Sequence, residues 1–192
     1  MRMFSGFYKT ARASFFLFTL LLMLGITTPV AAKGEAFIPE AITSWEDADF
    51  SLYEGKWVST GLGVEVYLPL GYEEEEINSQ EQEEGLILRL GDAKNNRTFT
   101  ASLANLSRDA SLMDIYADWF AMADYTWVSR LKVNGIEAVG FDEKDGVSGL
   151  AFLRPKGEMV LLAVYPTLEE EDREIAVNIL LSMRKEKEEE GS

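Results

Sequence analysis

Two short segments of the chain match motifs that hold a serine nucleophile in some hydrolases. Ser182-Met183-Arg184-Lys185 fits S-x-x-K, and Gly146-Val147-Ser148-Gly149 falls one residue short of G-x-S-x-G. The S-D-N and K-T-G motifs that accompany S-x-x-K are absent after residue 32, and the whole chain contains no histidine to act as a base. Both matches are therefore interpreted as chance. No catalytic residue is predicted, and the protein is predicted not to be an enzyme.

The composition excludes several further kinds of chemistry. The 192 residues include 18 Lys and Arg against 33 Asp and Glu, a formal charge of −15, and no cysteine. Without cysteine the chain has no disulfide, no thiolate nucleophile and no iron–sulfur cluster, and without histidine it has no imidazole metal ligand. A strongly acidic chain also repels phosphate backbones. We therefore expect no cofactor and no nucleic-acid partner.

Carboxylates are the abundant reactive group. Two of them at a suitable separation can hydrolyse a glycoside, so a carboxylate-only hydrolase stays open as an alternative function. Oxygen ligands also suit calcium. The densest acidic clusters, Glu46-Asp47-Ala48-Asp49 and Asp142-Glu143-Lys144-Asp145-Gly146, both lack EF-hand spacing, and the second is predicted to be a hairpin turn. No metal site is predicted.

The four tryptophans raise the possibility of sugar binding, because exposed indole rings stack on sugar rings. Trp119 lies on the apolar stripe of a predicted helix, and Trp127 shares strand parity with core residues, so both are expected in the core. Trp45 and Trp57 remain as candidate ligand-binding residues of a carbohydrate or small-ligand module. They suit equally well an anchor that holds the N-terminal leader onto the domain.

The N-terminus has the pattern of a secretory signal peptide. Arg2, Lys9 and Arg12 precede an apolar run over residues 15–26, and Val30-Ala31-Ala32 offers small residues before a cleavage point. We expect cleavage after Ala32, a secreted or extracytoplasmic protein, and membrane contact only through the signal peptide during export. A leader over 33–49, one domain over 50–186 and a charged tail over 187–192 are expected to follow.

Alternating apolar residues predict antiparallel strands joined by tight turns. The predicted strands are residues 57–60, 64–70, 86–90, 99–103, 127–133, 136–141, 147–153 and 158–165. Apolar residues occupy both parities of the last two strands, which indicates a sheet covered on both faces. The acidic stretch 73–84 has little to bury and is predicted to be a solvated loop.

Two helices are predicted from capping boxes that precede apolar stripes. Ser111 with Asp114 opens a helix that ends near Asp124, and Thr167 with Glu170 opens a final helix. The predicted fold class is α+β: an antiparallel β-sheet with helices covering both faces, a layered α/β/α sandwich.

This order of elements resembles the Mog1/PsbP-like fold, which includes small exported bacterial domains. The matching segments lie between Trp57 and Met183; they are Val66-Tyr67-Leu68-Pro69, Tyr116–Ala123, Val133-Asn134-Gly135-Ile136 and Ile179-Leu180-Leu181-Ser182-Met183. The resemblance implies a protein-binding or assembly module and locates no site.

The expected function is binding of an unidentified protein partner at the cell surface or in the envelope, by a monomer or weak oligomer. The expected surface is either a sheet edge or the acidic stretch 73–84. A carbohydrate or small-ligand module and a carboxylate-only hydrolase are the alternatives.

Overall fold

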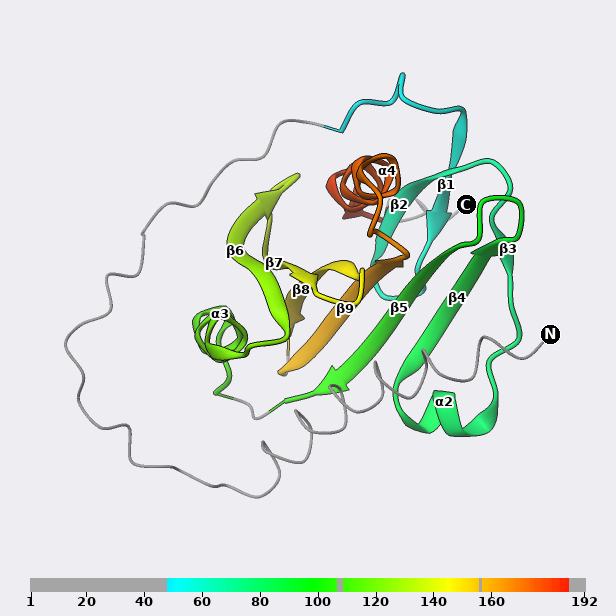
Figure 1. Cartoon of the computed structure of the whole chain (residues 1–192). Helices are drawn as coiled ribbons and strands as arrows, with labels where there is room; N and C mark the ends of the chain where they lie inside the picture. The colour runs from blue at the N-terminus through cyan, green and yellow to red at the C-terminus, as the bar shows by residue number, and fades with distance from the viewer. Residues whose placement is uncertain (1–47, 107–108, 156, 187–192) are drawn as a thin grey trace. The chain divides into compact units, whose positions relative to one another are not determined.

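Strands hold more of the described residues than helices do. The computed structural model describes residues 48–106, 109–155 and 157–186, all within residues 41–192, the second of two structural units. These residues form two antiparallel sheets and three helices, which makes the domain α+β as predicted (Figure 1). The predicted signal peptide over 1–32, nearly all of the leader and the tail from 187 lie outside the described residues.

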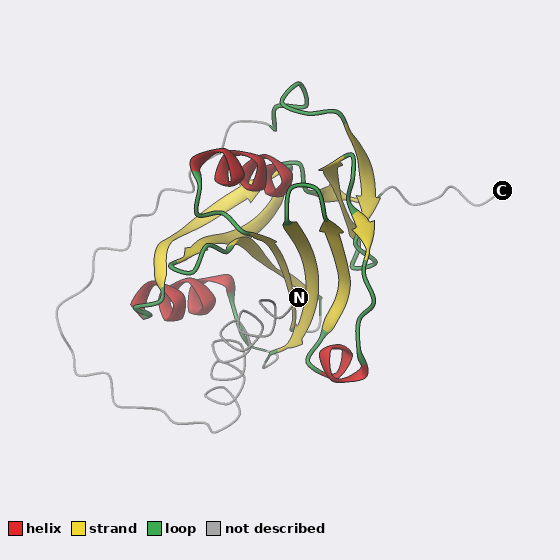
Figure 2. Cartoon of the chain, turned by 45° about the vertical axis from the view of Figure 1, so that its right-hand side comes forward, coloured by secondary structure: helices red, strands yellow, loops and turns green. Residues whose placement is uncertain are grey.

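The larger sheet has seven strands. In spatial order they are β3 (Glu73–Glu74), β4 (Leu86–Asp92), β5 (Arg97–Asn105), β9 (Glu158–Tyr165), β8 (Ser148–Arg154), β7 (Ile136–Glu143) and β6 (Tyr125–Val133). The smaller sheet has the order β1 (Gly55–Ser59), β2 (Val64–Pro69) and β10 (Arg184–Lys185). The three helices are α2 (Ser79–Glu83), α3 (Leu112–Ala121) and α4 (Glu170–Leu181), and Figure 2 separates them from the strands by colour.

The predicted hairpins are present. The β6–β7 turn is the tightest, because Val133 pairs directly with Ile136 across Asn134 and Gly135. Both turn residues have positive φ, 47° and 83°, the backbone that a two-residue hairpin requires and that the Asn-Gly pair predicted.

The main core lies between the seven-stranded sheet, the small sheet and α4. Alternate residues of β2, namely Val64, Val66 and Leu68, are buried here. The strand was predicted over residues 64–70 but ends at Pro69, and Leu70 beyond it is 52% exposed. From α4 and its C-terminal end the core receives Ala176, Ile179, Leu180 and Met183.

Helical cover of the sheet is unequal. The predicted Ser111–Asp114 capping box is confirmed at the start of α3, which ends at Ala121. α3 packs on β6 and β7, where Trp119 stacks on Tyr125 with ring centroids 5.5 Å apart. On β9, Val160, Leu162 and Val164 are fully buried, whereas Leu161 and Ala163 of the opposite parity are only half-buried.

The prediction of a capping box at Thr167 was wrong. α4 begins at Glu170, and its N-cap Glu169 makes no side-chain capping bond. Thr167 is buried instead, with its N–H donated to the Gly146 carbonyl at 2.9 Å and its hydroxyl 3.1 Å from Ser148 Oγ. Tertiary contact with the β7–β8 turn therefore replaced the local cap. Within the described residues, none of the helices is both long and apolar enough to cross a membrane.

Candidate functional site

Both serines of the near-motifs are buried and serve packing. Ser182 is fully buried; its hydroxyl donates to the Ile179 carbonyl at 2.5 Å and accepts the Tyr67 N–H at 2.7 Å, which ties the end of α4 to β2. Ser148 is 2% exposed and donates to Asp142 Oδ1 at 2.6 Å. Neither hydroxyl is open to a substrate.

The acidic segment Asp142–Gly146 forms the β7–β8 turn. Asp142 pairs with Arg173 of α4, and Glu143 lies close to Asp145 and Asp124. Burial raises the pKa of Glu143 to about 7, and the two neighbouring carboxylates add to the shift. Among the described residues, no three acidic side chains are grouped to hold a metal ion. A hollow beside this turn, between β6–β8 and α4, has a volume of about 10 Å³, room for a single water molecule.

The other acidic cluster falls largely outside the described residues, because Glu46 and Asp47 are not among them. Asp49 is described, and its carboxylate accepts hydrogen bonds from the Ser51 N–H at 2.8 Å and the Ser51 hydroxyl at 2.6 Å. These bonds lower the pKa of Asp49 and form a local turn.

Trp57, one of the two candidate ligand-binding tryptophans, lies half-buried within an aromatic cluster. The Arg184 guanidinium lies over its ring, 3.3 Å from the centroid. The rings of Phe50 and Tyr67 flank it at 5.6 and 5.5 Å. One face of the indole is thus occupied by a cation, and Phe50 packs the segment before β1 onto the small sheet. Trp45 lies outside the described residues.

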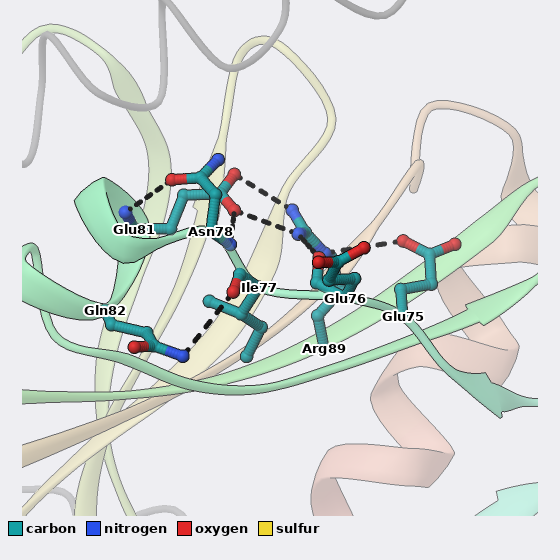
Figure 3. Close-up of polar contacts among 7 residues, drawn as sticks. All are labelled: Glu75, Glu76, Ile77, Asn78, Glu81, Gln82 and Arg89. Atoms are coloured by element: carbon teal, nitrogen blue, oxygen red, sulfur yellow. Dashed lines mark hydrogen bonds and ion pairs between the residues drawn. The ribbon is translucent and has the colours of Figure 1, made fainter.

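The acidic stretch 73–84 is folded against β4, unlike the solvated loop that its composition predicts. Arg89 of β4 is 7% exposed and Glu81 of α2 is 8% exposed. The two guanidinium Nη atoms donate to the two Glu81 carboxylate oxygens at 3.1 and 3.0 Å, as Figure 3 shows. Arg89 Nη2 also donates to the Glu76 carbonyl, and its Nε lies 3.4 Å from a Glu75 carboxylate oxygen. One buried arginine therefore holds three acidic residues of this stretch.

This ion pair closes one edge of the sheet. β3 pairs with β4 over only two residues, and the Glu75 N–H then donates to the Arg89 carbonyl at 3.0 Å. Beyond that point α2 packs on β4 near the end of the strand that is far from β3 (Figure 1). The Asn78 side chain caps α2, and Glu81 completes the capping box. We call residues 75–84 the edge cover.

The opposite edge of the sheet is β6, which is nine residues long. Among the described residues its ladder partner is β7 alone. In a two-residue hairpin the pair next to the turn, here Val133 and Ile136, exchanges both hydrogen bonds, and the bonding then alternates along the ladder. The main-chain groups of Val128, Arg130 and Lys132 therefore point away from β7. Within the described part of the chain, no backbone hydrogen bond is made on this side of β6.

Two basic side chains accompany these outward main-chain groups. Arg130 is half-buried and Lys132 is exposed, and both lie on the face of β6 that also carries Val128. In the register with β7, Arg130 lies opposite Val139 and Lys132 opposite Glu137. Neither base forms an ion pair with any described residue. We call β6 with these two bases the open edge.

Partial signals for these two edges are present in the sequence. Arg89 stands among alternating leucines in a strand, which places it on the face opposite them, yet nothing local points to Glu81 eight residues earlier. The Trp127–Val133 strand was predicted, but its place at the end of the sheet depends on a strand order that periodicity does not contain.

Comparison of the chain with known proteins gives a weak similarity to a solved structure and no match to a family model or a curated sequence. No protein-family model and no curated protein sequence matches it. Among solved structures it is similar to a protein of Bacteroides thetaiotaomicron VPI-5482, whose crystal structure was determined at 1.50 Å, with a TM-score of 0.41 and 14% sequence identity. The match covers 71% of this chain and 50% of the other, so the chain spans about half the length of that protein. This likeness is a weak resemblance in fold.

Proposed function

We propose that the protein is an exported, non-catalytic module that binds an extended segment of a partner protein as an additional strand along β6. The observation that carries this proposal is the open edge: nine residues at the end of a seven-stranded sheet, which described residues pair on one side only. Unpaired strand edges are templates for strand addition, a common mode of peptide recognition.

The main chain of β6 supplies the binding groups. Val128, Arg130 and Lys132 each offer one N–H donor and one carbonyl acceptor in the spacing of a β-ladder. The partner would match these groups with its own main chain, while its side chains on the α3 side meet Arg130 and Lys132. Affinity then comes from the ladder and specificity from the side chains.

The other two readings of the sequence have less support from the geometry. Sugar stacking on Trp57 is less supported, because the Arg184 guanidinium already covers one face of the indole ring. A hydrolase using Glu143 and Asp145 is not supported by the hollow beside their turn, because neither residue lines it and its volume of about 10 Å³ is too small for a sugar ring. Binding of an added strand along the open edge requires no cavity.

Export and family membership form part of the same proposal. The signal-peptide pattern over residues 1–32 supports action outside the cytoplasm, at the cell surface or in the envelope. The order of a β-hairpin, a helix, a run of antiparallel strands and a closing helix supports a Mog1/PsbP-like domain. The two bases on β6 support a monomer or weak oligomer, because charged edge residues oppose pairing between identical edges.

Amide hydrogen exchange tests the proposal directly. Random peptides of about ten residues, enough to span a long strand, are selected for binding to the full chain. In the free protein the amides of Val128, Arg130 and Lys132 should exchange fast, while those of Leu131 and Val133 stay protected. A bound peptide should then protect the first three amides.

A matched pair of variants checks that the edge itself binds. Arg130→Pro removes one outward N–H and places a ring in the path of an added strand, so it should abolish peptide binding. Arg130→Ala keeps the N–H and should retain binding. Peptides that protect another surface, or that bind Arg130→Pro as well as the unmodified chain, would overturn the proposal.

A further inference from the structure

Building on the proposed function, we infer that the strand added to β6 carries carboxylate side chains at alternate positions, where they pair with Arg130 and Lys132. The partner is thus an extended segment in which acidic residues recur every second position on the face shared with α3. The inference rests on the side chains of the open edge, whereas the proposed function rests on its main chain.

Arg130 differs from the other described arginines in its lack of a described carboxylate partner. Five arginines in the described part of the chain have a carboxylate within ion-pair distance; they are Arg89, Arg97, Arg154, Arg173 and Arg184. The chain holds nearly two acidic residues for each basic one, so a carboxylate partner is easily supplied. Arg130 has no such partner among the described residues, although it is half-buried and its planar donors suit a carboxylate.

The cross-strand neighbours show from which side a carboxylate can come. On β7, Arg130 faces the apolar side chain of Val139, so its inner neighbour offers no acceptor. An added strand would place a side chain directly opposite Arg130 on the outer side, with Cβ atoms about 5 Å apart. Lys132 lies two residues further along β6. It would face the residue two positions away on the added strand. Glu137 lies across from Lys132 on the inner side, without forming an ion pair.

The same geometry argues against a second copy of this chain as the occupant. Two β6 edges that pair antiparallel about Arg130 would bring Arg130 against Arg130 and place Lys132 near another base. Like charges directly opposite one another destabilise a strand pair. A partner with acidic residues at these positions removes that conflict.

Three defined peptides test the inference on the full chain. Each has about ten residues in which threonine alternates with glutamate, glutamine or lysine, long enough for a strand. Two cross-strand ion pairs should make the glutamate peptide bind roughly three- to thirty-fold tighter than the glutamine peptide, with the lysine peptide weakest. The glutamate advantage should shrink as salt is raised, because the paired charges are partly exposed to solvent.

Two double variants assign the effect to the open edge. Arg130→Gln with Lys132→Gln should make the glutamate and glutamine peptides bind equally. Lys56→Gln with Lys94→Gln removes the same charge from exposed positions on β1 and the β4–β5 turn and should leave the preference intact. Equal binding of the glutamate and glutamine peptides to the unmodified chain, with β6 amides protected, overturns the charge inference alone. Failure of all peptides to protect β6 overturns the proposed function.

Discussion

The two edges of the seven-stranded sheet differ, because one is covered and the other is open. At the β4 edge, a two-residue strand and a short helix cover the ladder, and a buried Arg89–Glu81 pair holds them there. At the β6 edge, the outer side of a nine-residue strand has no ladder partner among the described residues, and no described carboxylate pairs with Arg130 or Lys132. Proteins usually cover or shorten such edges, and the contrast between the two edges is the basis of the proposal that β6 binds a partner strand.

The comparison also gives the acidic stretch a structural explanation. A run of four glutamates, Glu73–Glu76, suggests a docking strip for a basic partner. Arg89 of the same domain instead lies near the Glu75 carboxylate, donates to the main-chain carbonyl of Glu76 and pairs with Glu81 of α2. The stretch therefore acts first as a cover for β4.

Replacing Arg89 by alanine should have the largest effect on stability. The substitution leaves the Glu81 carboxylate buried without its guanidinium, which should lower the free energy of unfolding by about 3–5 kcal/mol. Urea denaturation measures this loss. The β4 amides should also lose exchange protection, because the edge cover is released.

Lys94→Ala is the matched control for Arg89→Ala, since Lys94 is exposed in the β4–β5 turn and its removal should cost less than about 0.5 kcal/mol. The paired change Arg89→Met with Glu81→Leu should recover most of the lost stability, because it leaves no buried charge. A loss below about 1 kcal/mol for Arg89→Ala would show that the ion pair does not hold the cover.

Local signals in the sequence were sufficient for the hairpins. Asn134-Gly135 marked the β6–β7 turn, and the Ser111–Asp114 capping box marked the start of α3. Both signals act through bonds between near neighbours, so they do not depend on the rest of the fold. The α+β class followed from these elements.

Long-range contacts explain the structural features that the sequence patterns did not predict. Thr167 has the pattern of a helix cap, but a hydrogen bond to the Gly146 carbonyl, 21 residues away, fixes it on another turn. The acidic stretch appeared to have nothing to bury because its apolar contribution is small, yet one arginine outside it supplies the interaction. The open edge became visible only with the strand order.

Proline substitutions on neighbouring residues of β6 should separate the inner ladder from the outer edge. Leu131→Pro removes an N–H that bonds to β7 and a buried side chain, and should cost about 3 kcal/mol or more. Arg130→Pro removes an N–H that points outward and should cost less than about 1 kcal/mol. Thermal or urea unfolding of the two variants measures the difference. Equal losses would mean that the outward groups of β6 are already bonded.

The β6 side of the sheet should make the protein less stable as pH rises, because of Glu143 on β7. Glu143 lies opposite Tyr125, the first residue of β6, and burial raises its pKa to about 7 from an ordinary value of 4.5. The folded state thus binds a proton more tightly than the unfolded state. Stability from this group is fully present below pH 4.5 and is lost as pH rises through 7, by at most about 1.4 kcal/mol per pH unit.

Glu143→Gln should therefore stabilise the protein by about 1–2 kcal/mol at pH 8. Near pH 4.5 it should change the stability little. Urea midpoints between pH 4.5 and 8 measure this. Glu137→Gln, at an exposed position on the same strand, is the control. Parallel pH curves for the Glu143→Gln variant and the unmodified protein would show that Glu143 is ionised throughout.

The smallest expected effect concerns the cap of α2 and its dependence on the edge cover. α2 has five residues, too few to form a stable helix alone, so its Asn78 cap matters only while Arg89 holds Glu81 in place. Asn78→Ala should cost about 1 kcal/mol in the unmodified protein and close to nothing in the Arg89→Ala background. Ser111→Ala removes the equivalent cap from α3, far along the chain from Arg89, and should cost about 1 kcal/mol in both backgrounds. If the Asn78 and Arg89 losses simply add, the helix and the ion pair stabilise the molecule independently, and the β4 edge is not closed by a single cooperative unit.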